Sequence, residues 1–207
     1  MANWNQPVIL PVRSSMYVLV DKIVSGGQTG ADRGGLDAAI KLGIPHGGWC
    51  PRGRRAEDGK VPQRYVLRET GSTSYQVRTR RNVLDSDGTV IFTRGRLEGG
   101  SLLTQQIACE TGKPCLHLDL GKTAADHTAA VQQLRGWLVE ERIRILNVAG
   151  SRASMAPGLQ ATVARLLVTA LCEGQFDEER LMADQEGELV AADSPETFGG
   201  DRTDRKS

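Results

Sequence analysis

The chain has 207 residues, which suffices for one domain with a full hydrophobic core and leaves little room for a second. Hydrophobic residues make up 39% of the chain, and no apolar run reaches the length of a membrane-spanning helix, so we expect a globular protein without a membrane span. The net charge of +1 conceals ten acidic and four basic residues in residues 174–207, which leave 22 basic against 15 acidic residues, a charge of +7, on residues 1–173.

This basic body indicates an anionic partner. Aromatic residues make up only 4% of the chain and do not form the pattern of an RNA-binding sheet, so a small anionic ligand is expected rather than nucleic acid. The N-terminus lacks the charged, apolar and small-residue segments of a secretory signal. We therefore expect a cytoplasmic protein.

The predicted elements follow an N-terminal extension, residues 1–21, in which residues 17–20 form a short strand or helical turn. From residue 22 to residue 173, short apolar runs alternate with amphipathic stretches, which is the pattern of a parallel sheet crossed by helices. The predicted strands are residues 23–25, 88–93, 114–120 and 144–149. The predicted helices are residues 31–42, 74–84, 102–111, 124–142 and 157–172. The acidic residues 174–207 are predicted to form a tail outside this ligand-binding domain.

The densest motif, residues 25–35, directly follows the first predicted strand and opens the first predicted helix. Glycines let backbone N–H groups converge, and the helix N-terminus adds its positive dipole end, so this loop is predicted to bind an anion. It matches neither the dinucleotide-binding pattern nor a Walker motif. The alternative is a tight strand-to-helix turn without a ligand. The predicted binding residues of this loop are Gly26, Gly27, Gln28, Thr29 and Gly30.

Two helix starts have the residue types of a capping box, in which two side chains satisfy each other's backbone N–H groups. These are Thr29 with Asp32, and Thr73 with Gln76. Asp32 is therefore interpreted as a helix cap rather than as a general base. Pro157 suits the first turn of the last helix.

Two further glycine loops follow predicted strands, and they supply Gly99, Gly100, Ser101, Thr104 and Ser151 as candidate binding residues. The carboxyl ends of parallel strands meet at one edge of the sheet, where ligands bind in open α/β sheets. We therefore expect all three loops to converge on one crevice. Each later loop taken alone is equally well explained as a turn.

The aperiodic segment 47–59 contains Trp49 and Arg54, which together can stack a planar ligand and clamp an oxyanion. A solvated basic loop is the alternative. In the next helix, Tyr75, Arg78 and Asn82 share one face, which would add positive charge if it looks into the crevice. Arg80 points elsewhere.

Covalent or metal chemistry has little support in the sequence. No G-x-S-x-G elbow occurs, and neither Cys50 nor Cys109 has a histidine nearby in sequence. The four cysteines include no CxxC pair, and the three histidines are not spaced as metal ligands around them. We expect binding without catalytic residues, protein metal ligands or disulfides.

Several segments, including SGGQTGADRGGLDAA, GGWCPRGRRAEDG, DSDGTVIF, EGGSLLT and NVAGSR, resemble the bacterial molybdenum carrier (molybdenum cofactor carrier protein) family. The resemblance covers about residues 22–172. The family lies within the Rossmann-like superfamily that includes cytokinin-activating nucleoside monophosphate hydrolases. It implies a Rossmann-like, doubly wound, mainly parallel α/β sheet with helices on both faces, and a homo-oligomer, either a dimer or a tetramer.

The implied function is to bind, protect and hand on molybdenum cofactor, a phosphorylated pterin that brings its own molybdenum. Recipients would be molybdoenzymes or cofactor-synthesis proteins. The resemblance places the cofactor's oxyanions on the first and second glycine loops, with Arg78 and Arg81 as cationic supports.

The hydrolase relatives carry catalytic glutamates after their glycine turn, where this sequence has Gln105 and Gln106. A neutral amide cannot activate water as a carboxylate does, so the replacement argues against an enzyme. The alternative function is a nucleotide-binding sensor or a phosphoribohydrolase-like enzyme.

Overall fold

The computed structural model describes residues 17–121 and 123–173. Its centre is a five-stranded, wholly parallel sheet with the strand order β3-β2-β10-β8-β9. The bounds are β2 Lys22–Ser25, β3 His46–Gly47, β8 Gly88–Thr93, β9 Cys115–Asp119 and β10 Ile145–Gly150. The four predicted strands are confirmed, and β3 is an additional short edge strand.

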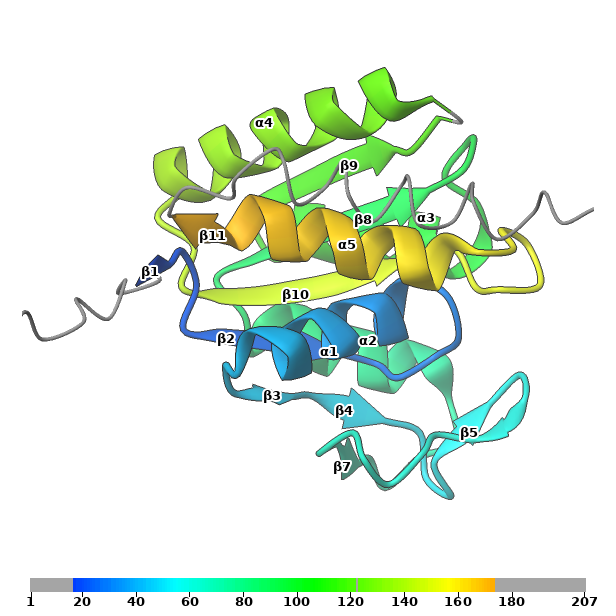
Figure 1. The fold of residues 1–207 in the computed structure, drawn as a ribbon. Helices are drawn as coiled ribbons and strands as arrows, with labels where there is room; N and C mark the ends of the chain where they lie inside the picture. Colours follow the sequence, from blue (N-terminus) through cyan, green and yellow to red (C-terminus); the bar gives the residue numbers. More distant parts are fainter. Residues whose placement is uncertain (1–16, 122, 174–207) are drawn as a thin grey trace, which may run out of the picture. The chain divides into compact units, whose positions relative to one another are not determined.

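Five helices cover the two faces of this sheet, which makes the fold α/β and Rossmann-like. The bounds are α1 Ala31–Leu42, α2 Tyr75–Leu84, α3 Gly99–Glu110, α4 Ala124–Glu140 and α5 Leu159–Leu171. Figure 1 shows α1, α4 and α5 on one face and α2 and α3 behind the other. All five predicted helices are confirmed, although α3 begins three residues earlier than predicted.

The position of β10 in the sheet, between β2 and β8, determines where a ligand-binding crevice can form. The connection after β2 leads to the edge strand β3, whereas the connection after β8 leads to β9 at the opposite edge. β10 enters last, between β2 and β8. The carboxyl ends of β2, β10 and β8 therefore lie at the topological switch point, where α/β sheets bind ligands.

Three short strand pairs surround the central sheet. β1 Tyr17–Val18 pairs with β11 Cys172–Glu173, which confirms the strand alternative for residues 17–20. β4 Trp49–Cys50 pairs with β7 Arg68–Glu69, and β5 Arg55–Ala56 forms a hairpin with β6 Gly59–Lys60. The segment 47–59, which was predicted to be a loop, therefore contains short strands. The first sixteen residues of the predicted extension, and the predicted acidic tail, lie outside the described residues.

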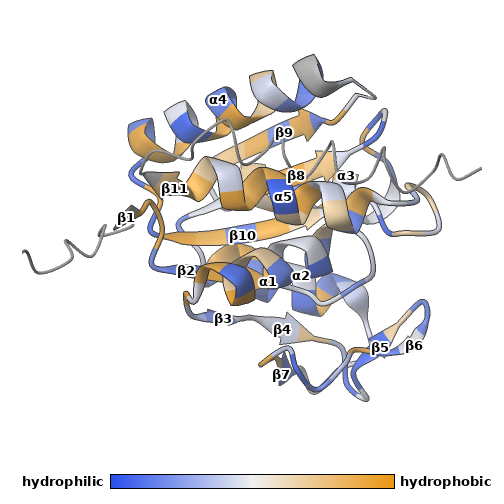
Figure 2. Ribbon diagram, in the orientation of Figure 1, coloured by the Kyte–Doolittle hydropathy of each residue, from blue (hydrophilic) through white to orange (hydrophobic). Residues whose placement is uncertain are grey.

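The main core fills the space between the sheet and the layer of α1, α4 and α5. All six residues of β8 are buried, as expected for a strand covered on both faces. Figure 2 shows the hydrophobic colour along β9 and β10. A smaller cluster of Leu36, Cys50, Val61 and Tyr65 anchors the β4–β7 region to α1.

The predicted capping boxes are wrong. Gly30 is the N-cap of α1 and Ser74 that of α2, and neither helix has a side-chain cap hydrogen bond. A capping box does occur at α4, between Thr123 and Asp126. Pro157 precedes α5 rather than forming its first turn, because the N-cap is Gly158. The Thr29 hydroxyl instead donates a hydrogen bond to Glu57, and the Asp32 carboxylate accepts one from Arg78.

Candidate functional site

A pocket of about 290 Å³ opens at the carboxyl ends of β2, β10 and β8. The three glycine loops meet there, as the sequence predicts, together with the start of α2. Its lining consists of Gln28, Asp32, Tyr75, Arg78, Thr79, Arg96, Glu98, Gly99, Gly100, Ser101, Leu103, Thr104, Ala149, Gly150, Ser151, Arg152 and Met155.

The floor of the pocket contains an ion pair between α1 and α2. Arg78 Nη1 lies 3.2 Å from Asp32 Oδ2, and the two side chains are only 13% and 4% exposed. Arg78 Nε is buried and has no hydrogen-bond partner among the described residues. Burial raises the pKa of Asp32 above its usual range, although Arg78 and the N–H of Gln28 oppose the shift.

Gly26 sets the position of this arginine. A Cβ at residue 26 would lie 1.7 Å from Arg78 Nη1, so the guanidinium rests directly against the glycine backbone. Gly26 itself does not line the pocket. Its contribution to the site is the space that it leaves for Arg78.

The N-terminus of α3 forms the opposite wall. The first N–H groups of an α-helix have no partner within the helix. No heavy atom lies within 4 Å of a Cβ built on Gly99 or Gly100, and both glycines line the pocket. The Ser101 hydroxyl donates to Glu98 O, and the Thr104 hydroxyl donates to Gly100 O. The N–H groups of Gly99 and Gly100, rather than these hydroxyls, are therefore the donors suited to an anion.

The charges around the pocket favour an anion overall. Arg78, Arg96 and Arg152 contribute three positive charges, whereas Asp32 and Glu98 contribute two negative charges. None of Arg96, Glu98 and Arg152 is among the binding residues that the sequence predicts. Their position in the sequence could have indicated a binding role, because these residues flank the second and third glycine loops directly.

Several predicted binding residues do not line the pocket. Gly27 packs against Val61 and Leu67, where a side chain would clash, and Gly30 packs against the Ser151 carbonyl. Thr29 donates to Glu57. Among the residues predicted for the first loop, only Gln28 reaches the pocket wall.

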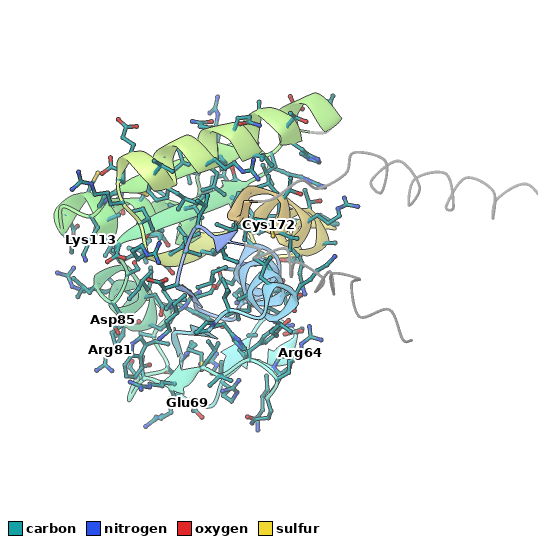
Figure 3. The ribbon with its side chains drawn as sticks, turned by 60° about the vertical axis from the view of Figure 1, so that its left-hand side comes forward. Arg64, Glu69, Arg81, Asp85, Lys113 and Cys172 are labelled. Carbon is teal, nitrogen blue, oxygen red and sulfur yellow. The ribbon has the colours of Figure 1, made fainter. Side chains whose placement is uncertain are left out.

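Trp49 and Arg54, which were predicted to contact a ligand, instead contact other residues of the chain. The Arg54 guanidinium donates to the carbonyls of four residues and so fixes the loop that follows. Trp49 lies under Arg81, with 4.4 Å between the guanidinium carbon and the ring centre, and its Nε1 donates to Asp85. Figure 3 shows Arg81 and Asp85 close together and away from Arg64.

The shared face on α2 is only partly directed at the pocket. Tyr75 and Arg78 line it, but Asn82 is buried against the backbone of Trp49. Arg80 lies outside the lining and pairs with Glu110, as expected for a surface residue.

Within the described residues, no group of three or more histidine, cysteine, aspartate or glutamate side chains could hold a metal ion. All four cysteines, at positions 50, 109, 115 and 172, are free thiols. No helix in the described part of the chain is long and apolar enough to span a membrane.

Comparison with known proteins gives two matches. The model of the circularly permutated YpsA SLOG family matches residues 23–171, which include all three glycine loops. A crystal structure described as a "putative molybdenum carrier protein" from Syntrophus aciditrophicus SB is 47% identical and has a TM-score of 0.71. The match covers 74% of this chain and 96% of that one. No curated protein matches the chain.

Proposed function

Because this chain belongs to the circularly permutated YpsA SLOG family, we propose that its pocket binds a small phosphorylated ligand between Arg78 and the N-terminus of α3. One observation carries the proposal: a mostly buried guanidinium and the two glycines that begin α3 line the same pocket. Charge-assisted hydrogen bonds from such donors are the strongest that a phosphate receives from a protein.

The ligand that we propose is molybdenum cofactor, which the protein binds, protects and hands on without chemical change. The name of the Syntrophus protein supports this choice. The volume of about 290 Å³ is near the lower limit for small-molecule pockets, so the phosphate end enters and the pterin extends toward the rim. Tyr75 and Met155, both exposed, provide an apolar surface there. The proposal includes a cytoplasmic homo-oligomer that delivers the cofactor to molybdoenzymes.

A second candidate is hydrolysis of a nucleoside monophosphate. It is favoured by the two carboxyl groups, Asp32 and Glu98, that line the pocket. The pKa of Asp32 is raised by burial, so the two groups are held in different environments, as a general acid and a general base require. Against it, the Asp32 carboxylate is already engaged by Arg78 and by the N–H of Gln28.

Incubation with each ligand distinguishes the two candidates. After gel filtration, we expect the protein to retain molybdenum cofactor, measured as the fluorescent oxidised pterin. AMP and GMP should remain intact, with base released more slowly than about 0.1 per second, which is below the ordinary enzyme range. Glu98→Gln provides the control, because it should abolish any hydrolysis and leave cofactor retention in place. Steady release of base that disappears in Glu98→Gln would establish the hydrolase instead.

A further inference from the structure

The hairpin β5–β6 places Glu57 and Asp58 at its tip, against the first and third glycine loops. The Glu57 carboxylate accepts hydrogen bonds from the Thr29 hydroxyl, from Ser154 N at 3.2 Å and from Ser154 Oγ at 2.6 Å. Arg152 Nε lies 3.8 Å from the same carboxylate. Two hydroxyls, a backbone N–H and a guanidinium are the donor set that binds an oxyanion, and here the chain's own carboxylate fills it.

This carboxylate adjoins the pocket. Arg152 lines the pocket and also pairs with Glu57. Gln28, another lining residue, accepts a hydrogen bond from Glu57 N at 2.9 Å. Arg152 therefore lies between the pocket and the place of the Glu57 carboxylate, where it can contact an anion that extends from one to the other.

The tip residues Glu57 and Asp58 are attached to the domain by polar contacts. The base of the hairpin is fixed by Arg54, whose guanidinium binds the carbonyls of the following loop. The tip itself is held by polar contacts, namely those of Glu57 and the ion pair of Asp58 with Arg33. Neither tip residue belongs to a hydrophobic cluster. Segments with few buried apolar contacts open at low free-energy cost.

We propose that Glu57 is a built-in competitor for the ligand: its carboxylate occupies a second oxyanion subsite, formed by Thr29, Arg152 and Ser154, and a ligand with a diphosphate displaces it and lifts the hairpin tip. This inference rests on the proposed function, because it takes the first phosphoryl group to lie beside Arg78. A diphosphate is the chemistry that places two linked oxyanions on one shared arginine. Ligands with two linked phosphoryl groups would therefore differ from monophosphates at this site, because only the former displace Glu57.

Inorganic phosphate and pyrophosphate test this, because they differ by the one group that should meet Glu57. Glu57→Gln keeps the size of the side chain and removes its charge, so it should raise the affinity for pyrophosphate about tenfold and that for phosphate less than about twofold. Both affinities are measured by ³¹P NMR titration. The matched control is Glu69→Gln, the same substitution on β7, where the carboxylate binds Gly53 N away from the glycine loops. It should change neither affinity.

A second measurement uses the unmodified protein and does not depend on how well the variant folds. Pyrophosphate should accelerate backbone hydrogen exchange in residues 55–60, because it releases the hairpin tip, whereas phosphate should not. Slower exchange of this segment with pyrophosphate would overturn the proposal, since the tip would then close on the ligand. The proposal would also be overturned if Glu57→Gln raised the affinities for phosphate and pyrophosphate equally, or if it raised neither. These results do not test the proposed carriage of molybdenum cofactor, which is measured separately by retention of the cofactor.

Discussion

Gly150→Ala is expected to remove at least about 4 kcal/mol of stability, which is a large share of the usual total of about 5–15 kcal/mol. Gly150 ends β10 with φ +151°, and an added Cβ would lie 1.9 Å from the Phe92 carbonyl oxygen of β8. That oxygen is backbone in the centre of the sheet and accepts a hydrogen bond from Ser151 N, so it cannot move aside. Urea unfolding followed by circular dichroism measures the loss.

The matched control is Gly136→Ala in α4. Nothing lies within 4 Å of a Cβ at Gly136, and this position is in the interior of the helix. The same substitution should therefore stabilise the protein by about 0.5–1 kcal/mol. A Gly150→Ala protein as stable as the unmodified chain would show that β10 and β8 do not approach as closely as described.

Arg78→Ala should weaken the binding of molybdenum cofactor by about tenfold to a hundredfold, equivalent to about 1.5–3 kcal/mol for a lost charge-assisted contact. The effect should be large because this guanidinium is mostly buried and its Nε has no partner among the described residues. Arg80→Ala is the control on the same helix. Its side chain is 53% exposed and pairs with the exposed Glu110, so its loss should change binding and stability little. Calorimetric titration measures the affinities.

Removing Arg78 also leaves the Asp32 carboxylate buried without its cation, which costs stability by itself. The double variant with Asp32→Asn removes that unpaired charge and should recover stability without recovering binding. Gly26→Ala gives an independent test, because its Cβ would displace the guanidinium while the arginine remains in the chain. It should weaken binding to the same extent. Unchanged cofactor affinity in both Arg78→Ala and Gly26→Ala would refute the assignment of Arg78.

The secondary structure was well predicted because it follows from local patterns. Helix α1 and strand β8 have the predicted bounds, since an amphipathic repeat and a continuous apolar run each depend on neighbours in sequence. Helix caps were poorly predicted. Thr29 and Asp32 had the residue types of a capping box, but Glu57 and Arg78, distant in sequence, take their hydrogen bonds.

The meeting of the three glycine loops was predicted from the sequence, whereas several residues predicted to bind the ligand lie outside the pocket lining. Arg78 and Arg81 lie on the same helix and looked equivalent as cationic supports. Arg78 lies against Gly26 and lines the pocket, whereas Arg81 lies over the Trp49 ring. The sequence contains both arginines, but only the packing of α2 against the loops distinguishes them.

The α/β class and the meeting of the glycine loops at one edge follow from the sequence, because parallel strands all place their carboxyl ends on the same side. The tertiary structure decided the strand order and therefore which atoms face the pocket. Glu57 contacts Ser154 across 97 residues of sequence, and that contact exists because β10 enters the sheet beside β2 and brings the third loop next to the first. Local periodicity carries no information about such contacts, since they depend on the order in which distant strands pair.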